Sequence, residues 1–411
     1  MTDHTATDRH EADRRAFDRH VAHTSPFANG LQIASAEGCW ITDVEGSRYL
    51  DFIAGIAVCN VGHCHPAVVQ AVRRQAGLYA HTMVYGEHVQ APQVRLATEI
   101  AAVAPPGLDC VYFMTTGAEA NDAALKMAAK LTGRRKLLAF RKAYHGDTFG
   151  AAAVFGDEAF RAGYAHVLHP TVEWARHGSF DDLEMIDAAT ACVLVEPVQG
   201  EAGIRVPPPG WLAALRARCT EVGAMLVFDE VQTGFGRLGS WFAAGHYGVT
   251  PDAITMAKGM GMGLPLAGLL APRDMLWRFA AEPAFSHITT FGGHPVSCAA
   301  ALAGMEAIRD GELLCNARVR GRWLKEALSG PDFRVVREVR GEGLMIGVEF
   351  DDDATARRVV EGCKARGMIV ETNLMAEHVV RLSPPLNVTA DECGLAMATL
   401  GKAVSEAVEG C

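Results

Sequence analysis

Met225-Leu226-Val227-Phe228-Asp229 and Thr255-Met256-Ala257-Lys258 are two stretches in which a short apolar run ends in an ionisable residue, with a glycine soon after. Such runs are typical of strands that are buried on both faces of a parallel sheet. The carboxyl ends of parallel strands meet at one edge of the sheet, where open α/β folds bind their ligands. The two stretches therefore predict an α/β fold in which an acid and a lysine share one crevice.

An acid and a lysine in one crevice match the needs of pyridoxal phosphate. A lysine side chain can bind the aldehyde of this cofactor as a Schiff base. A carboxylate can keep the pyridine nitrogen protonated, so that the ring accepts electrons from the substrate. Asp229 and Lys258 are therefore the candidate catalytic residues.

The composition is that of an ordinary globular protein. The chain has 411 residues, of which 49% are hydrophobic and 21% charged, and this length suggests two or three domains. The net charge of −10 argues against a nucleic-acid partner, because phosphate binding needs a basic face. No apolar stretch reaches the roughly 18 residues of a membrane span, so we expect no membrane partner.

The first 25 residues predict a mobile tail. They alternate acidic, basic and histidine residues and lack the apolar centre of a secretory signal. The eleven cysteines are scattered without a CxxC pair, which favours a reducing compartment and predicts a cytoplasmic protein. His63-Cys64-His65 could suggest a metal, but neighbours in sequence seldom converge on one ion without further spaced ligands, so we predict none.

Strands and helices alternate over residues 66–291, which predicts a large domain with a mostly parallel sheet covered by helices. We expect strands at 110–114, 136–140, 191–195 and 266–270, besides those that end at Asp229 and before Lys258. The expected helices span 66–76, 89–104, 118–131 and 209–221.

Residues 292–411 predict a smaller α+β domain. Helices are expected at 295–308, 312–328, 354–366 and 390–408, and strands at 335–339, 344–350, 368–370 and 379–382. Residues 26–65, with two strands around a turn within 38–52, are expected to pack against this domain.

The other motifs follow one another in a specific order. Residues 112–121 predict a strand, a small-residue turn and a helix start, where free N–H groups suit a phosphate. Tyr144-His145-Gly146, residues 196–201 and residues 289–293 follow. Together with Gly62-His63-Cys64-His65-Pro66 and residues 229–237, this set resembles the class III aminotransferases over residues 26–408.

These enzymes use pyridoxal phosphate and have fold type I. Within the family the chain is similar to the 4-aminobutyrate, ornithine, acetylornithine and putrescine aminotransferases. The resemblance implies a large domain with a mostly parallel mixed sheet and a smaller α+β domain at the carboxyl terminus.

The resemblance also implies the residues that hold the cofactor. Lys258 resembles the Schiff-base lysine, which also moves a proton, and Asp229 would pair with the pyridinium nitrogen. Thr290 resembles a threonine that reaches the phosphate from the neighbouring subunit, which implies a homodimer with shared active sites. The remaining contacts would come from Gln232 to the phenolic oxygen, Val231 and Tyr144 on the two ring faces, and the N–H groups of Gly117 and Ala118 to the phosphate.

Four residues bear on the substrate. Arg381 resembles the arginine that binds the α-carboxylate of glutamate or 2-oxoglutarate, and Glu201 resembles the glutamate that pairs with it in the other half-reaction. Asp147 stands where 4-aminobutyrate enzymes have an arginine, and Ile56 stands where ornithine enzymes have a tyrosine. Both differences argue against those two substrates, and the charge of Asp147 favours a cationic or neutral far end of the donor.

We therefore predict an aminotransferase that moves an amino group from a primary ω-amine, such as a diamine or an ω-amino acid, to 2-oxoglutarate by a ping-pong mechanism. Pyruvate is a less favoured acceptor. An amino-acid racemase or aminomutase of the same fold is the alternative, and a catalytically silent relative is a third possibility, which intact Lys258 and Asp229 argue against.

Overall fold

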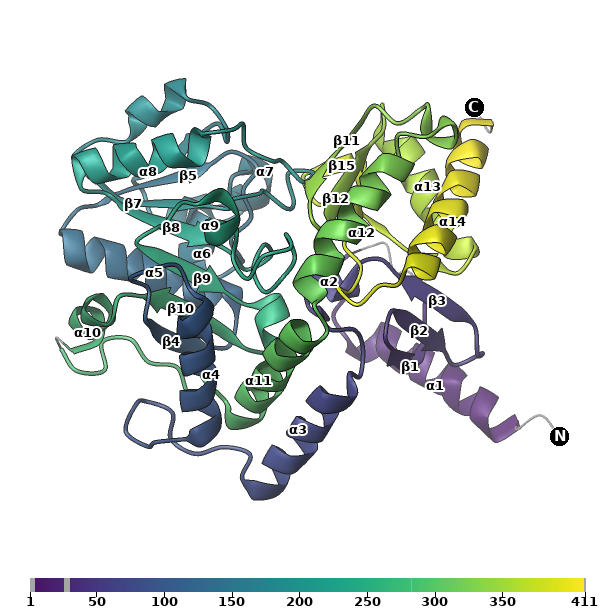
Figure 1. Ribbon diagram of the computed structural model, residues 1–411, viewed down its shortest axis with the longest axis horizontal. Helices are drawn as coiled ribbons and strands as arrows, with labels where there is room; N and C mark the ends of the chain where they lie inside the picture. Colours follow the sequence, from purple (N-terminus) through teal and green to yellow (C-terminus); the bar gives the residue numbers. More distant parts are fainter. Residues whose placement is uncertain (1–3, 26–29, 282, 410–411) are drawn as a thin grey trace.

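The computed structural model describes residues 4–25, 30–281 and 283–409. Three sheets organise the described chain, and helices cover them (Figure 1). The largest sheet has seven strands in the order β4-β10-β9-β8-β7-β5-β6. All neighbouring strands are parallel except β10, which runs antiparallel to β4 and β9. This confirms the predicted mixed, mostly parallel sheet. Its strands are β4 (Cys110–Met114), β5 (Lys136–Phe140), β6 (Val172–Ala175), β7 (Thr190–Val195), β8 (Met225–Asp229), β9 (Ala253–Met256) and β10 (Ala267–Ala271).

The central strands β7, β8 and β9 are buried along their whole length. Alternate side chains point to opposite faces of a strand, so one apolar run serves two cores. In β8, Met225 and Val227 join the core under α5 (Gly117–Thr132). Leu226 and Phe228 join the core under α8 (Trp211–Val222). This double burial explains why the run carries no polar residue before Asp229.

The small domain consists of a four-stranded antiparallel sheet in the order β11-β12-β15-β14, with helices against it. Its strands are β11 (Glu338–Glu342), β12 (Met345–Glu349), β14 (Glu371–Asn373) and β15 (Ala376–Leu382). Its helices are α12 (Leu313–Ala327), α13 (Asp353–Ala365) and α14 (Ala390–Glu409). The predicted small α+β domain is thus confirmed, although β11 begins three residues later than expected and β14 was not predicted.

The third sheet joins the two ends of the chain. Strands β1 (Ile33–Glu37), β2 (Trp40–Asp43) and β3 (Arg48–Asp51) form a meander, and β13 (Met368–Ile369) pairs with β3 in parallel. The N-terminal strands therefore lie beside the carboxyl-terminal part of the chain (Figure 1). The predicted bounds of the N-terminal segment, 26–65, stay a prediction. Within the expected tail, α1 (His4–His20) is a helix that was not predicted, and Arg14 donates a hydrogen bond to the Gly30 carbonyl at 3.0 Å.

Helix α11 (Pro295–Asp310) packs against α3 (Pro66–Leu78) and α4 (Ala91–Val103) before it reaches α12. The domain boundary that we predict at residue 292 lies just before this helix and stays a prediction. The shorter elements are α2 (Ala54–Ala57), α6 (Phe149–Ala153), α7 (Glu158–Arg161), α9 (Ala243–Tyr247), α10 (Arg273–Ala281), η1 (Ala165–Val167), η2 (Asp181–Met185), η3 (Lys258–Gly261) and η4 (Pro331–Phe333). Within the described ranges, no helix combines the length and apolar character needed to cross a membrane.

Arg237 connects three parts of the molecule from a fully buried position. Its Nη1 donates to the carbonyl of Leu344 at 3.0 Å and to that of Pro384 at 2.5 Å, both in the small domain. Its Nη2 donates to Oδ1 of Asn60, in the N-terminal segment, at 2.7 Å. Burial lowers the pKa of this guanidinium to about 9, with Asp51 opposing the shift.

Candidate active site

A cavity of about 650 Å³ opens at the carboxyl ends of β7, β8 and β9. This is the edge at which parallel sheets bind ligands. The cavity is lined by all the residues predicted for the cofactor except Thr290: Gly117, Ala118, Tyr144, Asp229, Val231, Gln232 and Lys258. The acid and the lysine therefore face one crevice, as the two apolar runs predict.

Asp229 is held by three donors. Its Oδ2 accepts hydrogen bonds from Nδ2 of Asn121 at 2.8 Å and pairs with Nδ1 of His145 at 2.7 Å. Its Oδ1 accepts from the backbone N–H of Val231 at 3.0 Å. Asp229 is only 4% exposed, so these bonds replace the water that a buried carboxylate loses. They also prevent the side chain from turning.

The partners of Asp229 were not predicted as site residues. Asn121 also donates to the carbonyl of His145 at 2.8 Å and accepts from the hydroxyl of Thr255 at 2.7 Å. Thr255 lies on β9, three residues before Lys258. The network thus links the strand that carries the lysine to the acid on β8. A polar residue on a core-facing helix position, as at Asn121, was the available signal.

Lys258 begins η3, with one residue between it and the end of β9, and has a φ of 46° in the left-handed region. Burial lowers the pKa of its ammonium group, with Arg381 acting in the same direction. Glu201, Asp229 and Glu196 oppose that shift. A lowered pKa increases the neutral amine, which is the form that can bind an aldehyde or take up a proton.

The start of α5 presents backbone N–H groups to the cavity. Thr116 caps this helix: its side chain accepts from the N–H of Glu119, and the Glu119 side chain accepts from the N–H of Thr116. The N–H groups of Gly117 and Ala118, at the start of the helix, have no carbonyl of a preceding turn to bind. There is no room for a side chain at Gly117, in this helix start, or at Gly146, which packs against it. A Cβ at Gly117 would lie 2.9 Å from Cγ2 of Val231, and one at Gly146 would lie 2.4 Å from Cβ of Ala118. The helix start and its dipole suit a phosphate.

The residues present fit pyridoxal phosphate. Gln232 is buried, and its Nε2 has no hydrogen-bond partner among the described residues, so it can donate to a ligand oxygen in the cavity. The free N–H groups of α5 suit the phosphate, and Asp229 suits a protonated ring nitrogen. Tyr144 is the aromatic on the cavity wall, and its ring packs edge-on against Phe155 with centroids 5.3 Å apart.

Arg381 and Glu201 form a buried bidentate ion pair. Nη1 and Nη2 of Arg381 lie 2.7 and 3.0 Å from the two carboxylate oxygens of Glu201. Glu201 also accepts from the N–H of Leu374 at 2.9 Å, and Arg381 donates to the carbonyl of Thr372. Burial alone would raise the pKa of Glu201, but the attraction of Arg381 outweighs it and the net shift is downward.

Asp147 lines the cavity from an exposed position. The hydroxyl of Tyr144 donates to its Oδ2 at 2.7 Å. Burial, followed by this bond, raises the pKa of the Tyr144 hydroxyl.

Three predicted residues do not line the cavity. Arg381 lies behind Glu201, which does line it. Ile56 lies in α2, a turn in which four successive residues have positive φ, with φ 63° at Ile56 itself. Thr290 is exposed, away from this cavity. A role for Thr290 in the site of another subunit stays a prediction.

Glu196 is a further cavity residue to which no role was assigned. It ends the β7 run, is 6% exposed, and accepts from the N–H groups of Tyr144 and Gly200 at 3.0 and 2.8 Å. Burial raises the pKa of its carboxyl to about 7, and the charge of Asp229 contributes. The position at the end of a buried strand, like that of Asp229, was the signal for it.

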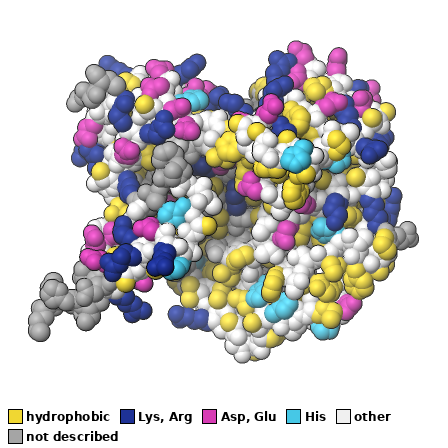
Figure 2. Space-filling model, turned by 180° about the vertical axis from the view of Figure 1, so that it is seen from behind, with side chains coloured by type: hydrophobic (Ala, Val, Ile, Leu, Met, Phe, Trp, Pro, Cys, Tyr) yellow, Lys and Arg dark blue, Asp and Glu magenta, His cyan; other side chains and the backbone are white. Residues whose placement is uncertain are grey.

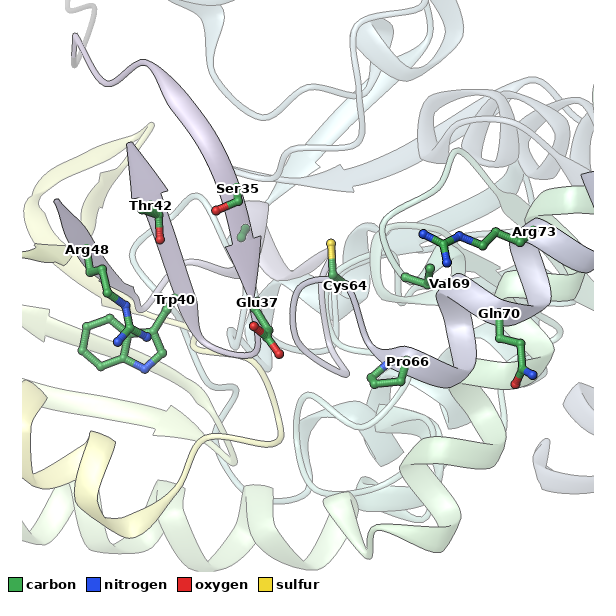
Figure 3. Close-up of a pocket in the computed structure, with 11 residues that line it drawn as sticks. Ser35, Glu37, Trp40, Thr42, Arg48, Cys64, Pro66, Val69, Gln70 and Arg73 are labelled. Atoms are coloured by element: carbon green, nitrogen blue, oxygen red, sulfur yellow. The ribbon is translucent and has the colours of Figure 1, made fainter. Parts of the chain in front are cut away.

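A second, larger cavity of about 790 Å³ lies between the N-terminal sheet and α3 (Figure 3). Trp40 and Arg48 reach it from the strands, with the guanidinium 4.6 Å from the ring centroid, and Cys64 and Arg73 reach it from the other side. None of the predicted site residues lines it. Within the described residues, no group of three His, Cys, Asp or Glu side chains could hold a metal ion.

Comparison with known proteins agrees with this geometry. The profile of the "Aminotransferase class-III" family matches residues 21–404. The acetylornithine aminotransferase of Methanosarcina mazei is 39% identical over 364 residues, covering 88% of this chain and 89% of that protein. That of Methanopyrus kandleri is 41% identical over 377 residues, covering 91% and 94%.

Solved structures give the same result. An (S)-enantioselective omega-transaminase from Thermomicrobium roseum superimposes with a TM-score of 0.90 at 30% identity, covering 97% of this chain and 98% of that chain. The ornithine aminotransferase of Toxoplasma gondii has a TM-score of 0.89 at 29% identity, covering 97% and 95%. The chain belongs to the class III aminotransferases, which depend on pyridoxal phosphate and transfer an amino group from an amine to a keto acid.

Proposed function

We propose that this enzyme transfers the amino group of a primary ω-amine to 2-oxoglutarate in two successive half-reactions. The observation that carries the proposal is the buried ion pair of Arg381 and Glu201. Both charges shift the pKa of Lys258, so the pair lies near the lysine. A planar guanidinium binds a carboxylate with two parallel hydrogen bonds, so Arg381 suits a diacid acceptor.

The side chains around the cavity divide the chemistry among them. Pyridoxal phosphate supplies an electron-withdrawing ring that acidifies the C–H bond next to the substrate nitrogen. Asp229 would keep a proton on the ring nitrogen, and Gln232 would donate to the phenolic oxygen. Lys258 would hold the cofactor covalently and then carry the proton at its Nζ, for which its lowered pKa suits it.

Glu201 would allow one pocket to accept two kinds of substrate. While the donor reacts, Glu201 neutralises Arg381, which would otherwise be a buried unpaired charge. When the keto acid enters, its carboxylate takes the place of the Glu201 carboxylate on Arg381. The exchange replaces one ion pair by another, so the guanidinium is never left without an anion.

The donor would react through a terminal amine on an unbranched carbon. The negative charge of Asp147 favours a diamine, whose far end is cationic. The names of the curated relatives instead support N-acetylornithine, which presents a neutral amide and a carboxylate. The carboxylate would have to bind away from Asp147, so these two donors make opposite demands on that residue.

The active sites would be shared within a homodimer. Large hydrophobic side chains are exposed on the α3–α4 connection and on the segment that carries Thr290: Leu78, Met83, Tyr85, Val89, Phe285, Ile288 and Phe291. Hydrophobic and histidine side chains also gather on the lower part of the face in Figure 2. A second copy of the chain would cover such a patch.

A panel of amines tests the proposed reaction. The holoenzyme is incubated with 2-oxoglutarate and either putrescine, N-acetylornithine, ornithine or 4-aminobutyrate, and glutamate formation is measured. We expect glutamate with at least one of the first two donors. A racemase or aminomutase would consume its substrate without a keto acid, so turnover that does not require 2-oxoglutarate or pyruvate contradicts the proposal.

Mixed dimers test the shared site. A Lys258→Ala subunit paired with a Thr290→Val subunit would contain one intact site, because that site takes its lysine from one chain and its threonine from the other. We expect the mixture to recover part of the wild-type activity. Activity equal to the mean of the two parent homodimers would show that Thr290 does not act across an interface.

A further inference from the structure

Glu196 connects two loops of the cavity wall that follow the neighbouring strands β5 and β7. One carboxylate oxygen accepts from the N–H of Tyr144, which follows β5, and the other accepts from the N–H of Gly200, which follows β7. The first loop carries Asp147, and the second carries Glu201 immediately after Gly200. A single buried side chain thus fixes the position of one loop relative to the other.

The two carboxylate oxygens of Glu196 bind segments that have different roles in the proposed pocket. The loop of Tyr144 forms the donor side of the proposed pocket. The turn at Gly200 carries the glutamate that exchanges with the acceptor. Gly200 packs so closely against Gln232 that a Cβ there would lie 2.1 Å from Gln232 Oε1, so the turn is in contact with a predicted cofactor ligand.

We propose that Glu196 is a positioning residue that keeps the Gly200 turn in place while Glu201 releases Arg381. The inference rests on the proposed function, in which Glu201 moves between the half-reactions. It concerns the backbone that carries this glutamate rather than the ion pair itself. Glu196 acts through Gly200 and Tyr144 and is not a catalytic residue.

The effect of Glu196 is concentrated in one half-reaction. With Arg381 paired, Glu201 is held by two bonds from that guanidinium and one from the N–H of Leu374. The two bonds between Arg381 and Glu201 are lost when the carboxylate of the acceptor binds Arg381. The bond from Glu196 to Gly200 then becomes the side-chain contact that holds the residue next to Glu201, so the acceptor step needs it more than the donor step.

The two backbone N–H donors suit a carboxylate at this site, because it can accept from both. His145 lowers the pKa of Glu196, whereas Asp229 raises it. Glu196 in turn raises the pKa of Lys258. His177 touches only the backbone, with Nε2 3.1 Å from the Glu196 carbonyl. The ionised form accepts both N–H groups, whereas an amide offers one oxygen and must turn its NH₂ towards the other donor.

Glu196→Gln tests the inference, with Glu230→Gln as a matched control. Glu230 is likewise a buried carboxyl that directly follows a strand. It accepts from the N–H groups of Ala243 and Ala244, and burial raises its pKa to about 7. It is not part of the cavity wall. The two half-reactions are measured separately on holoenzyme by cofactor absorbance: amine alone, then the aminated enzyme with 2-oxoglutarate.

For Glu196→Gln we expect the apparent Kd for 2-oxoglutarate to rise about tenfold, the scale of one lost buried hydrogen bond, while the donor step changes less than about threefold. Glu230→Gln is expected to lose stability without changing the ratio of the two steps. If Glu196→Gln slows both steps equally, or behaves like Glu230→Gln, the inference is wrong.

Glu196→Asp covers the case in which the amide variant does not fold. Its carboxylate is one methylene shorter and cannot reach both N–H groups, so the same selective loss is expected, and an unchanged acceptor step overturns the inference. A wild-type enzyme that forms no glutamate from 2-oxoglutarate contradicts the proposed function instead, independently of these variants.

Discussion

The two halves of the active site are built differently. The cofactor half lies within the large domain, where β8, β9 and α5 bring Asp229, Lys258 and Asn121 together. The substrate half spans both domains, with Arg381 on β15 and Glu201 on the turn after β7. Asp229 is held by Asn121, His145 and the N–H of Val231, whereas Arg381 is held in a bidentate pair with Glu201, whose place the acceptor carboxylate takes in the proposed function.

Under the proposed function, the charge on Asp229 keeps its partners through the reaction, whereas the charge on Arg381 exchanges its partner. Asp229 has three donors that hold its two oxygens, so nothing is released when the substrate changes. The bonds between Arg381 and Glu201 are as short, at 2.7 and 3.0 Å, but Glu201 lies in a turn. Substitutions in the two halves should therefore affect different kinetic constants.

The largest effect is expected in the cofactor half. Asp229→Asn removes the negative charge that would keep the ring nitrogen protonated and places an amide among donors. We expect kcat to fall by about 10²–10³-fold for every amine, with little change in the apparent Kd for 2-oxoglutarate. A loss confined to one substrate would contradict the division between the halves.

The substrate half should show a smaller and selective loss. Arg381→Ala leaves Glu201 as a buried unpaired charge, which costs about 3–5 kcal/mol of stability. It should raise KM for 2-oxoglutarate about 100-fold and leave the donor half-reaction active. The double variant with Glu201→Ala should recover stability, measured by urea unfolding, but not acceptor binding. Recovery of both would show that Arg381 does not bind the acceptor.

A still smaller shift is expected at Asp147, because this carboxylate is exposed and screened. Asp147→Arg should move the ratio of kcat/KM for putrescine and 4-aminobutyrate about tenfold towards 4-aminobutyrate. Asp147→Asn, which removes the charge and keeps an acceptor for the Tyr144 hydroxyl, should fall between the two. An unchanged ratio would remove Asp147 from donor selection.

The last effect concerns stability rather than turnover, and it depends on pH. The pKa of Glu230 is raised from 4.5 to about 7 by burial, so the folded state holds more protons than the unfolded state between these values. The free energy of unfolding should therefore decrease as pH rises through this window, by at most about 1.4 kcal/mol per pH unit for this group. Glu230→Gln should flatten this slope in thermal unfolding scans at pH 5–7.5, and an identical slope would contradict the assignment.

The sequence predicts the cofactor half better than the substrate half for a physical reason. The strands 110–114 and 136–140 were predicted with their observed bounds, because apolar runs between turns determine them locally. The position of Asp229 beside Lys258 follows from the rule that parallel strands end at one edge. The partners His145 and Asn121 depend on contacts between residues 84 and 108 positions apart, which no local pattern encodes.

Short or irregular elements were also missed. Strand β6 is a four-residue edge strand with half of its side chains buried, so its pattern is too brief to recognise. The turn that contains Ile56 has four successive positive φ values, although three of its residues are not glycine. Such a conformation depends on the surrounding structure, so residue type does not predict it.

Arg237 bears on the cooperativity of unfolding. Its guanidinium donates to the small domain and to the N-terminal segment from a loop of the large domain. Separation of any of these units breaks hydrogen bonds of this buried cation. Melting of the three units is therefore coupled through one side chain, and heating should give a single cooperative transition rather than stepwise detachment of the lobes.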